Sequence, residues 1–299
     1  MKNNNFSEIY VYFEKISSLH GAITHYYHFF YVVLIPIILK YIEYSKKYEK
    51  VVIVINNDLG PMLKILLALP IDIKLKPYIS PNIELKNDYL TALDIAPNYK
   101  NTNKNPRDLI WIKKKYATFF TNTMYKKINK WFQEQINKND LVLQPYIKYD
   151  VVVIERKTNM AYYSKESLKK NNIFKTSGAQ RRSIINHQIW FNAIKEYFKK
   201  LNCISISTEY LPIFDQYVLF NNAKILIAQH GAALANIAFL KEKTTVIEIM
   251  TQKLLDDGEN WFVPLSNVAH VKHLQYVSND FHINIDIQDF CKFMSANNL

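Results

Sequence analysis

A strand–turn–helix–strand pattern in residues 223–250 constrains the fold more than any other stretch of the sequence. Residues 225–228 form a short apolar run, which is typical of a parallel strand covered on both faces. The small and apolar residues 232–240 favour a helix, and the β-branched segment 245–250 favours a second strand. This order predicts a parallel sheet in an α/β protein.

The corner after the first strand, Gln229-His230-Gly231, is polar and contains a glycine. Gly231 allows a close backbone approach or a positive φ. The amides of residues 231–234 open a helix, whose N-terminus stabilises an anion by ~0.3–1 kcal/mol. His230 can donate a hydrogen bond to a phosphate or sugar oxygen. The alternative is a plain β-α-β core unit in which His230 caps the helix, since the corner is neither a G-x-G-x-x-G motif nor a P-loop.

Family resemblance adds a functional expectation. The string Q-H-G-A-A-L-A-N-I-A-F-L…V-I-E-I (229–249) resembles the H-G-A-G-L-x-N-x-x-F-L…V-I-E-I signature of glycosyltransferase family 61. Upstream segments resemble other family elements in family order: Y-Y-H-F-F…L-I-P (26–36), V-V-V-I-E-R (151–156), R-R-S-I-I-N (181–186) and F-D-Q-Y-V (214–218). The resemblance is dense over residues 151–250 and patchy before residue 150.

The resemblance implies an inverting, nucleotide-sugar-dependent transferase of the GT-B fold, with two Rossmann-like α/β domains that face each other across a cleft. We expect an acceptor-side domain at residues 1–145 and a nucleotide-sugar-binding domain at residues 146–299. A terminal helix is expected at residues 286–294, and in GT-B enzymes such a helix often crosses back to the first domain.

The remaining pattern agrees with an α/β chain. Strands are predicted at residues 8–13, 51–55, 71–75, 203–207 and 269–277, and helices at 24–47, 60–69, 108–137 and 187–201. Pro36 should kink or interrupt the first of these helices.

Sugar transfer from a nucleotide diphosphate requires stabilisation of the charge on the departing diphosphate. No two Asp residues are separated by a single residue, so the metal-holding D-x-D motif is absent. The resemblance therefore implies a metal-free site with arginines at the phosphates. Arg156, Arg181 and Arg182 are the candidates, since a guanidinium pairs bidentately with phosphate. We favour Arg182 over Arg181 and expect one of the pair to lie on the surface.

The remaining donor-binding candidates come from the signature itself. His230, Gly231, Ala232 and Asn236 are expected near the diphosphate or the donor sugar. Glu248 either accepts hydrogen bonds from ribose or sugar hydroxyls or makes a structural hydrogen bond, and the sequence does not separate the two.

The general base is less clear. Many relatives carry Asp or Glu four residues after the N-terminal His, but that position is Val32 here. His28, followed by His25, is the best substitute, because a neutral imidazole acts as a base at neutral pH; the alternative is a packed aromatic helix. No carboxylate or Cys lies near these histidines in the sequence to complete a zinc site. We expect no metal and no cofactor beyond the sugar nucleotide.

The chain of 299 residues has a net charge of +12 and two cysteines. The charge favours phosphate-bearing partners or a lysine-rich surface, but no nucleic-acid-binding motif accompanies it. Without a signal peptide or an apolar run long enough to span a bilayer, we expect a soluble, cytoplasmic or other intracellular protein. The leading hypothesis is a glycosyltransferase that moves a sugar to a glycan or glycoprotein, with UDP as the carrier that the family resemblance implies. The alternatives are a catalytically inactive sugar-nucleotide-binding scaffold and, more weakly, a nucleic-acid-binding protein.

Overall fold

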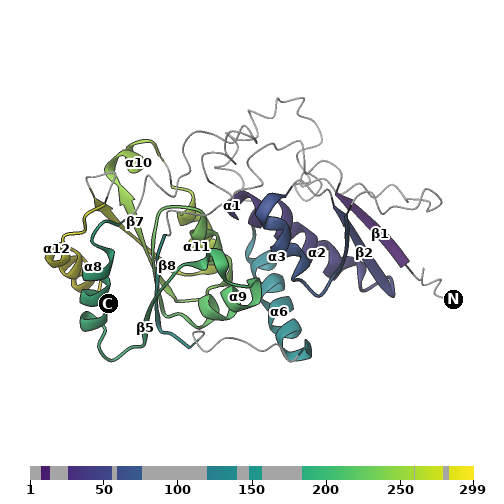
Figure 1. The fold of residues 1–299 in the computed structure, drawn as a ribbon, viewed down its shortest axis with the longest axis horizontal. Helices are drawn as coiled ribbons and strands as arrows, with labels where there is room; N and C mark the ends of the chain where they lie inside the picture. The colour runs from purple at the N-terminus through teal and green to yellow at the C-terminus, as the bar shows by residue number, and fades with distance from the viewer. Residues whose placement is uncertain are drawn as a thin grey trace. The chain divides into compact units, whose positions relative to one another are not determined.

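The computed structural model describes residues 8–13, 26–55, 59–75, 120–139, 148–156, 184–258, 260–278 and 283–299. The chain divides into two compact units, Met1–Asp140 and Leu141–Leu299 (Figure 1). Both units are mixed α/β structures with parallel sheets, as the strand–helix order of the sequence predicts.

The sheet of the N-terminal unit contains β1 (Glu8–Phe13), β2 (Lys50–Ile55) and β3 (Asp72–Leu75), in that order. All pairs are parallel. In β2 the five residues after Lys50 are buried without alternation, as expected for a parallel strand covered on both faces. The three predicted strands are confirmed.

The first helical segment changes its geometry before Pro36. It begins as α1 (Tyr26–Phe29), continues as the π-helical turn η2 (Phe30–Leu34) and ends as α2 (Ile35–Tyr44). The Ile35 N–H donates to the Phe30 carbonyl, which is π-helical spacing. Pro36 has no N–H to continue the α-helical pattern, and the wider turn accommodates it. The predicted interruption at Pro36 is confirmed.

Two further helix predictions need adjustment. The predicted helix at 60–69 is a 3₁₀ turn, η3 (Gly60–Met62), followed by α3 (Leu63–Leu67). The predicted helix at 108–137 is confirmed from Asn122 onward as α6 (Asn122–Asn139), but Phe120 and Thr121 within the predicted range are not helical. The Thr121 Oγ1 accepts the Met124 N–H at 3.3 Å, which is an N-cap interaction that propensity over the longer window did not reveal. Residues 108–119 lie outside the described residues.

The C-terminal unit has a five-stranded parallel sheet in the order β5-β4-β6-β7-β8. Its strands are β4 (Val151–Ile154), β5 (Cys203–Ile206), β6 (Ile225–Gln229), β7 (Thr245–Thr251) and β8 (Lys272–Ser278). This is a Rossmann-like order in which the chain runs outward in one direction from β4 to β5 and in the other from β6 to β8. The reversal lies between β4 and β6.

Helices cover both faces of this sheet (Figure 1). On one face lie α8 (His187–Tyr197) and α12 (Ile287–Ala296), which share a core cluster with the strands. On the other lie α9 (Ile213–Asn222), the 3₁₀ helix η7 (Ala232–Phe239) and α11 (Phe262–Ala269). The short helices η6 (Thr208–Tyr210) and α10 (Gln252–Asp256) follow β5 and β7.

The terminal helix α12 packs within the C-terminal unit. The rings of Trp190 and Phe290 are 5.4 Å apart, and those of Tyr276 and Phe290 are 4.9 Å apart. All three side chains belong to the core cluster. Among the described residues, no helix is both long and apolar enough to cross a membrane.

Candidate functional site at the strand reversal

The carboxyl ends of β4 and β6 bring Arg156 and His230 together. Arg156 follows β4 by two residues, and His230 directly follows β6. The Arg156 Nη2 donates to the His230 carbonyl oxygen at 2.8 Å. Ligands of open α/β sheets bind outside the carboxyl ends of the strands, at the point where the strand order reverses. The contact lies at this point.

Gly231 is required by this contact. Its φ is +156° and its ψ is −171°, a combination that is nearly exclusive to glycine. A Cβ at this position would overlap the Nη2 of Arg156. The positive φ that the sequence offered as one reason for a glycine at this position is observed, and the group next to its backbone is a guanidinium of the same chain.

The helix that begins at Ala232 is a 3₁₀ helix of eight residues, where the sequence predicted a helix without specifying its kind. The Leu234 N–H donates to the Gly231 carbonyl at 3.0 Å and closes its first turn. The fully buried Asn236 bonds through Nδ2 to the Ala233 carbonyl at 3.1 Å and to the Gln216 Oε1 at 3.3 Å. Asn236 therefore holds η7 together and ties it to α9.

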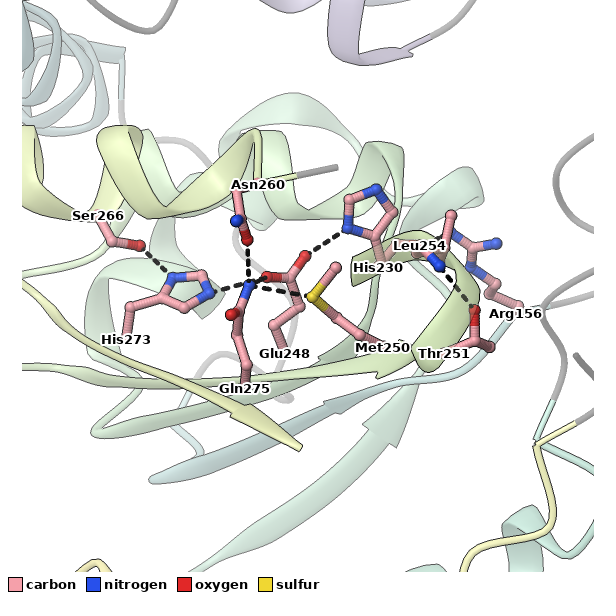
Figure 2. A network of polar contacts seen from close by, with 10 residues as sticks. All are labelled: Arg156, His230, Glu248, Met250, Thr251, Leu254, Asn260, Ser266, His273 and Gln275. Atoms are coloured by element: carbon pink, nitrogen blue, oxygen red, sulfur yellow. Dashed lines mark hydrogen bonds and ion pairs between the residues drawn. The ribbon is translucent and has the colours of Figure 1, made fainter. Parts of the chain in front are cut away.

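Glu248 is the centre of a buried polar network (Figure 2). Its side chain is fully buried in β7. Oε1 lies 2.6 Å from the His230 Nδ1, and Oε2 lies 2.9 Å from the His273 Nε2. The Gln275 Nε2 also donates to Oε2, at 3.0 Å. Both carboxylate oxygens are thus used within the protein, which is the structural alternative that the sequence left open for Glu248.

The outer end of the network lies on α11. The Ser266 Oγ is 2.6 Å from the His273 Nδ1, and Ser266 is fully buried. The Gln275 Nε2 reaches the Asn260 Oδ1 at 3.0 Å as well. Figure 2 shows these side chains in a continuous row from Ser266 through Glu248 to His230.

The electrostatics of Glu248 follow from its two histidines. Burial raises the pKa of this carboxyl, but hydrogen bonds from His230 and His273 and the favourable interaction with their charge outweigh burial and lower the pKa to about 2. The carboxylate is therefore ionised at neutral pH and can only accept hydrogen bonds. The His230 Nδ1 and the His273 Nε2 must both carry protons.

The side chain of His230 points into this network and away from solvent. It is 4% exposed, and its ring meets that of Phe262 edge-on at 5.2 Å. The partly exposed residues of this corner are therefore Gly231, Ala232 and Arg156.

Two further polar groups are buried at the same sheet edge. Gln229, the last residue of β6, and Ser207, which follows β5, are 3% and 8% exposed. Within the described part of the chain, neither the Gln229 Oε1 nor the Ser207 Oγ has a hydrogen-bond partner. A buried polar atom without a hydrogen-bond partner is unusual, and a bound molecule or water is a candidate for that partner.

Of the other predicted site residues, the structure describes only His28. His28 lies in α1 of the N-terminal unit, half-buried, with its ring 5.3 Å from that of Tyr27. His25, Arg181 and Arg182 lie outside the described residues. The Asn186 that ends the R-R-S-I-I-N element pairs with the backbone of Ile285 in both directions, at 2.8 and 3.0 Å. This residue fixes the segment before α8 to the segment before α12.

Sequence reasoning missed His273, Gln275 and Ser266. A signal existed in the alternation of β8, where His273 and Gln275 share one face of the strand and Leu274 and Tyr276 share the other. Among the described residues, no group of three His, Cys, Asp or Glu side chains could hold a metal ion. The two histidines bond to opposite oxygens of Glu248 and do not converge on one point.

Fold and site define a Rossmann-like α/β protein with a polar corner at the reversal of its strand order. The sequence model of the family described as Glycosyltransferase 61 matches residues 26–247. The chain belongs to this family and is a glycosyltransferase, as the quoted motifs indicated. No curated protein matches the chain significantly.

Proposed function

We propose that the chain is an inverting, metal-independent glycosyltransferase that takes its sugar from a nucleotide diphosphate, most simply UDP, and transfers it to a hydroxyl group of a glycan or glycoprotein. In this proposal the two units form a GT-B arrangement. The C-terminal unit binds the donor, and the N-terminal unit forms the acceptor side.

One observation carries the proposal: the Arg156 guanidinium, the Gly231 backbone and the start of η7 meet where the strand order reverses. Cationic and N–H donors concentrated at such a point favour a phosphorylated ligand. A charge-assisted hydrogen bond to phosphate contributes ~1.5–3 kcal/mol. Arg181 and Arg182 would add to this charge by family resemblance.

The chemistry requires few groups. The acceptor oxygen bonds to the anomeric carbon of the donor as the bond from that carbon to the diphosphate oxygen breaks. The electron pair of the broken bond leaves with the diphosphate, and the acceptor proton passes to a base. Arg156 and the η7 N-terminus would stabilise the departing charge. His28 is proposed as the base because Val32 cannot accept a proton.

A thermal-shift screen tests the donor class. The full chain is melted with UDP, GDP, CMP, dTDP and several UDP-sugars, each with and without EDTA. A ligand at ~100 times its dissociation constant adds ~2.7 kcal/mol of stability, which is a clear rise in Tm. We expect a rise with UDP compounds that EDTA does not remove.

The outcomes separate the parts of the proposal. A rise that EDTA abolishes would overturn metal independence, and a rise with another nucleotide would reassign the donor. Binding of UDP-sugar with neither transfer nor slow hydrolysis would favour an inactive sugar-nucleotide-binding protein. If no nucleotide changes Tm, the proposed donor site is wrong.

A further inference from the structure

The Glu248 network extends beyond the segment that matches the family. The match ends at residue 247, within the V-I-E-I string and one position before Glu248, whereas His273 and Ser266 lie well beyond it on β8 and α11. The partners of Glu248 matter because a carboxylate that is buried without charged or hydrogen-bonding partners strongly destabilises the fold.

Four hydrogen bonds connect the Glu248 network to the corner at His230 and Arg156. Ser266 meets the His273 Nδ1, and the His273 Nε2 meets the Glu248 Oε2. The Glu248 Oε1 meets the His230 Nδ1. The carbonyl of the same His230 then accepts from the Arg156 Nη2. Each hydrogen bond joins neighbouring elements, from α11 across β8 and β7 to the ends of β6 and β4.

We propose that His273 and Ser266 are positioning residues: acting through Glu248, they fix the ring and the proton of His230 and thereby hold the His230 carbonyl that orients Arg156. The inference rests on the proposed function only for the identity of the ligand that Arg156 meets. The position of the His230 ring can be tested without knowing which ligand binds.

The positions of the protons on His230 and His273 make the proposal specific. An ionised Glu248 requires the proton of His230 on Nδ1 and that of His273 on Nε2. Ser266 can donate its O–H to a neutral His273 or accept from a protonated one, so the network remains satisfied in both states of His273. The titratable groups that hydrogen-bond to Glu248 are His230, directly after β6, and His273 from β8. Gln275, which also bonds to Glu248, and Ser266, which bonds to His273, carry no charge.

The variants distinguish the effect of losing a hydrogen bond from the effect of changing the packing. His273→Leu removes the donor to Glu248, whereas His273→Gln retains an N–H that can reach a carboxylate. Ser266→Ala removes one oxygen at the far end of the row. His270→Asn is the matched control: this exposed histidine lies between α11 and β8 with a φ of 53°, which Asn tolerates well.

The readout is the long-range ¹H–¹⁵N spectrum of ¹⁵N-histidine-labelled full-length chain between pH 5 and 9, with UDP affinity measured on the same samples. In the wild type we expect the His230 proton on Nδ1 over this range. His273→Leu should change the His230 ring signals and weaken UDP binding by ~10-fold or more, the lower end of the loss found when a hydrogen-bond partner of a metal-binding histidine is removed. His273→Gln should restore most of both, and His270→Asn should change neither.

Unchanged His230 signals and unchanged UDP affinity in His273→Leu would overturn the inference. If that variant does not fold, as judged by circular dichroism, Ser266→Ala decides: altered His273 and His230 signals support the row of contacts, and unaltered signals refute it. If the wild type binds no UDP, the proposed donor site fails while the ring signals still decide the inference.

Discussion

The guanidinium of Arg156 lies where a side chain on Gly231 would have to be. Its Nη2 donates to the carbonyl of His230, the residue before the glycine, and a Cβ on Gly231 would overlap the same nitrogen. The arginine and the glycine are separated by 75 positions in the sequence. They form one unit because β4 and β6 are neighbours in the sheet.

Gly231→Ala should weaken both the fold and the site. The backbone conformation at this position costs a non-glycine residue on the order of 1–3 kcal/mol, and the methyl group displaces Arg156. We expect a loss of that size in the free energy of unfolding, measured with urea, and a loss of UDP binding. An alanine variant with wild-type stability and wild-type UDP affinity would show that neither the φ of Gly231 nor the contact matters.

Arg156→Lys should affect binding more than folding. Lysine keeps the charge but cannot form the planar, bidentate contacts of a guanidinium, so we expect UDP affinity to fall by ~10-fold, about 1.4 kcal/mol. The control is Lys224→Met, which removes a charge at the opposite edge of the same sheet, where Lys224 pairs with Asp150 at 2.9 Å. Equal losses in both variants would mean that the loss is not specific to the Arg156 guanidinium, because Arg156→Lys leaves the net charge unchanged.

His28→Asn should lower sugar transfer and leave donor binding unchanged. A general base contributes ~10²–10⁴-fold to a rate, and Asn cannot accept the acceptor proton. Initial rates of transfer and UDP affinity are measured together, with His270→Asn as the control. A full transfer rate in the His28 variant would remove this residue as the base and direct the search to other groups.

Phe290→Ala should destabilise the C-terminal unit without a direct effect on the site. Phe290 is 1% exposed and lies between the rings of Trp190 and Tyr276. Loss of a buried Phe costs ~3–5 kcal/mol, measurable by urea unfolding. Ile189→Ala on α8, where the side chain is 64% exposed, should stay within ~0.5 kcal/mol of the wild type; a similar loss in both variants would contradict the assigned core.

Local pattern was enough to predict most strands, because continuous apolar runs such as that of β2 arise when both faces of a parallel strand are covered. It also predicted the special role of Gly231, since few other residues suit a polar corner after a buried strand. The start of α6 at Asn122 coincides with a hydrogen bond from the Met124 N–H to the Thr121 Oγ1, a local contact that an average over a sequence window does not register.

The Glu248 network was harder to predict because it is a tertiary property. Glu248 was recognised in the V-I-E-I string, but its partners come from other elements: His230 lies 18 positions earlier and His273 25 positions later. Alternation in β8 could have placed His273 and Gln275 on one face of the sheet. It could not have shown that this face is the one that carries Glu248, because that depends on the register between β7 and β8.

Glu248→Gln should remove a contribution to stability that depends on pH. The folded pKa of about 2 lies below the ordinary value of 4.5, so the unfolded chain binds this proton more tightly than the folded one. The contribution is therefore fully present above pH 4.5 and is lost as the pH falls toward 2, and its size at pH 7 is on the order of a few kcal/mol. Urea unfolding of wild type and variant at pH 7, 5.5, 4.5 and 3.5 should show a difference in stability that is largest at pH 7 and shrinks below pH 4.5. A difference that stays constant over this range would mean that the carboxylate is not held ionised by His230 and His273, and that the row of contacts from Ser266 to Arg156 does not depend on its charge.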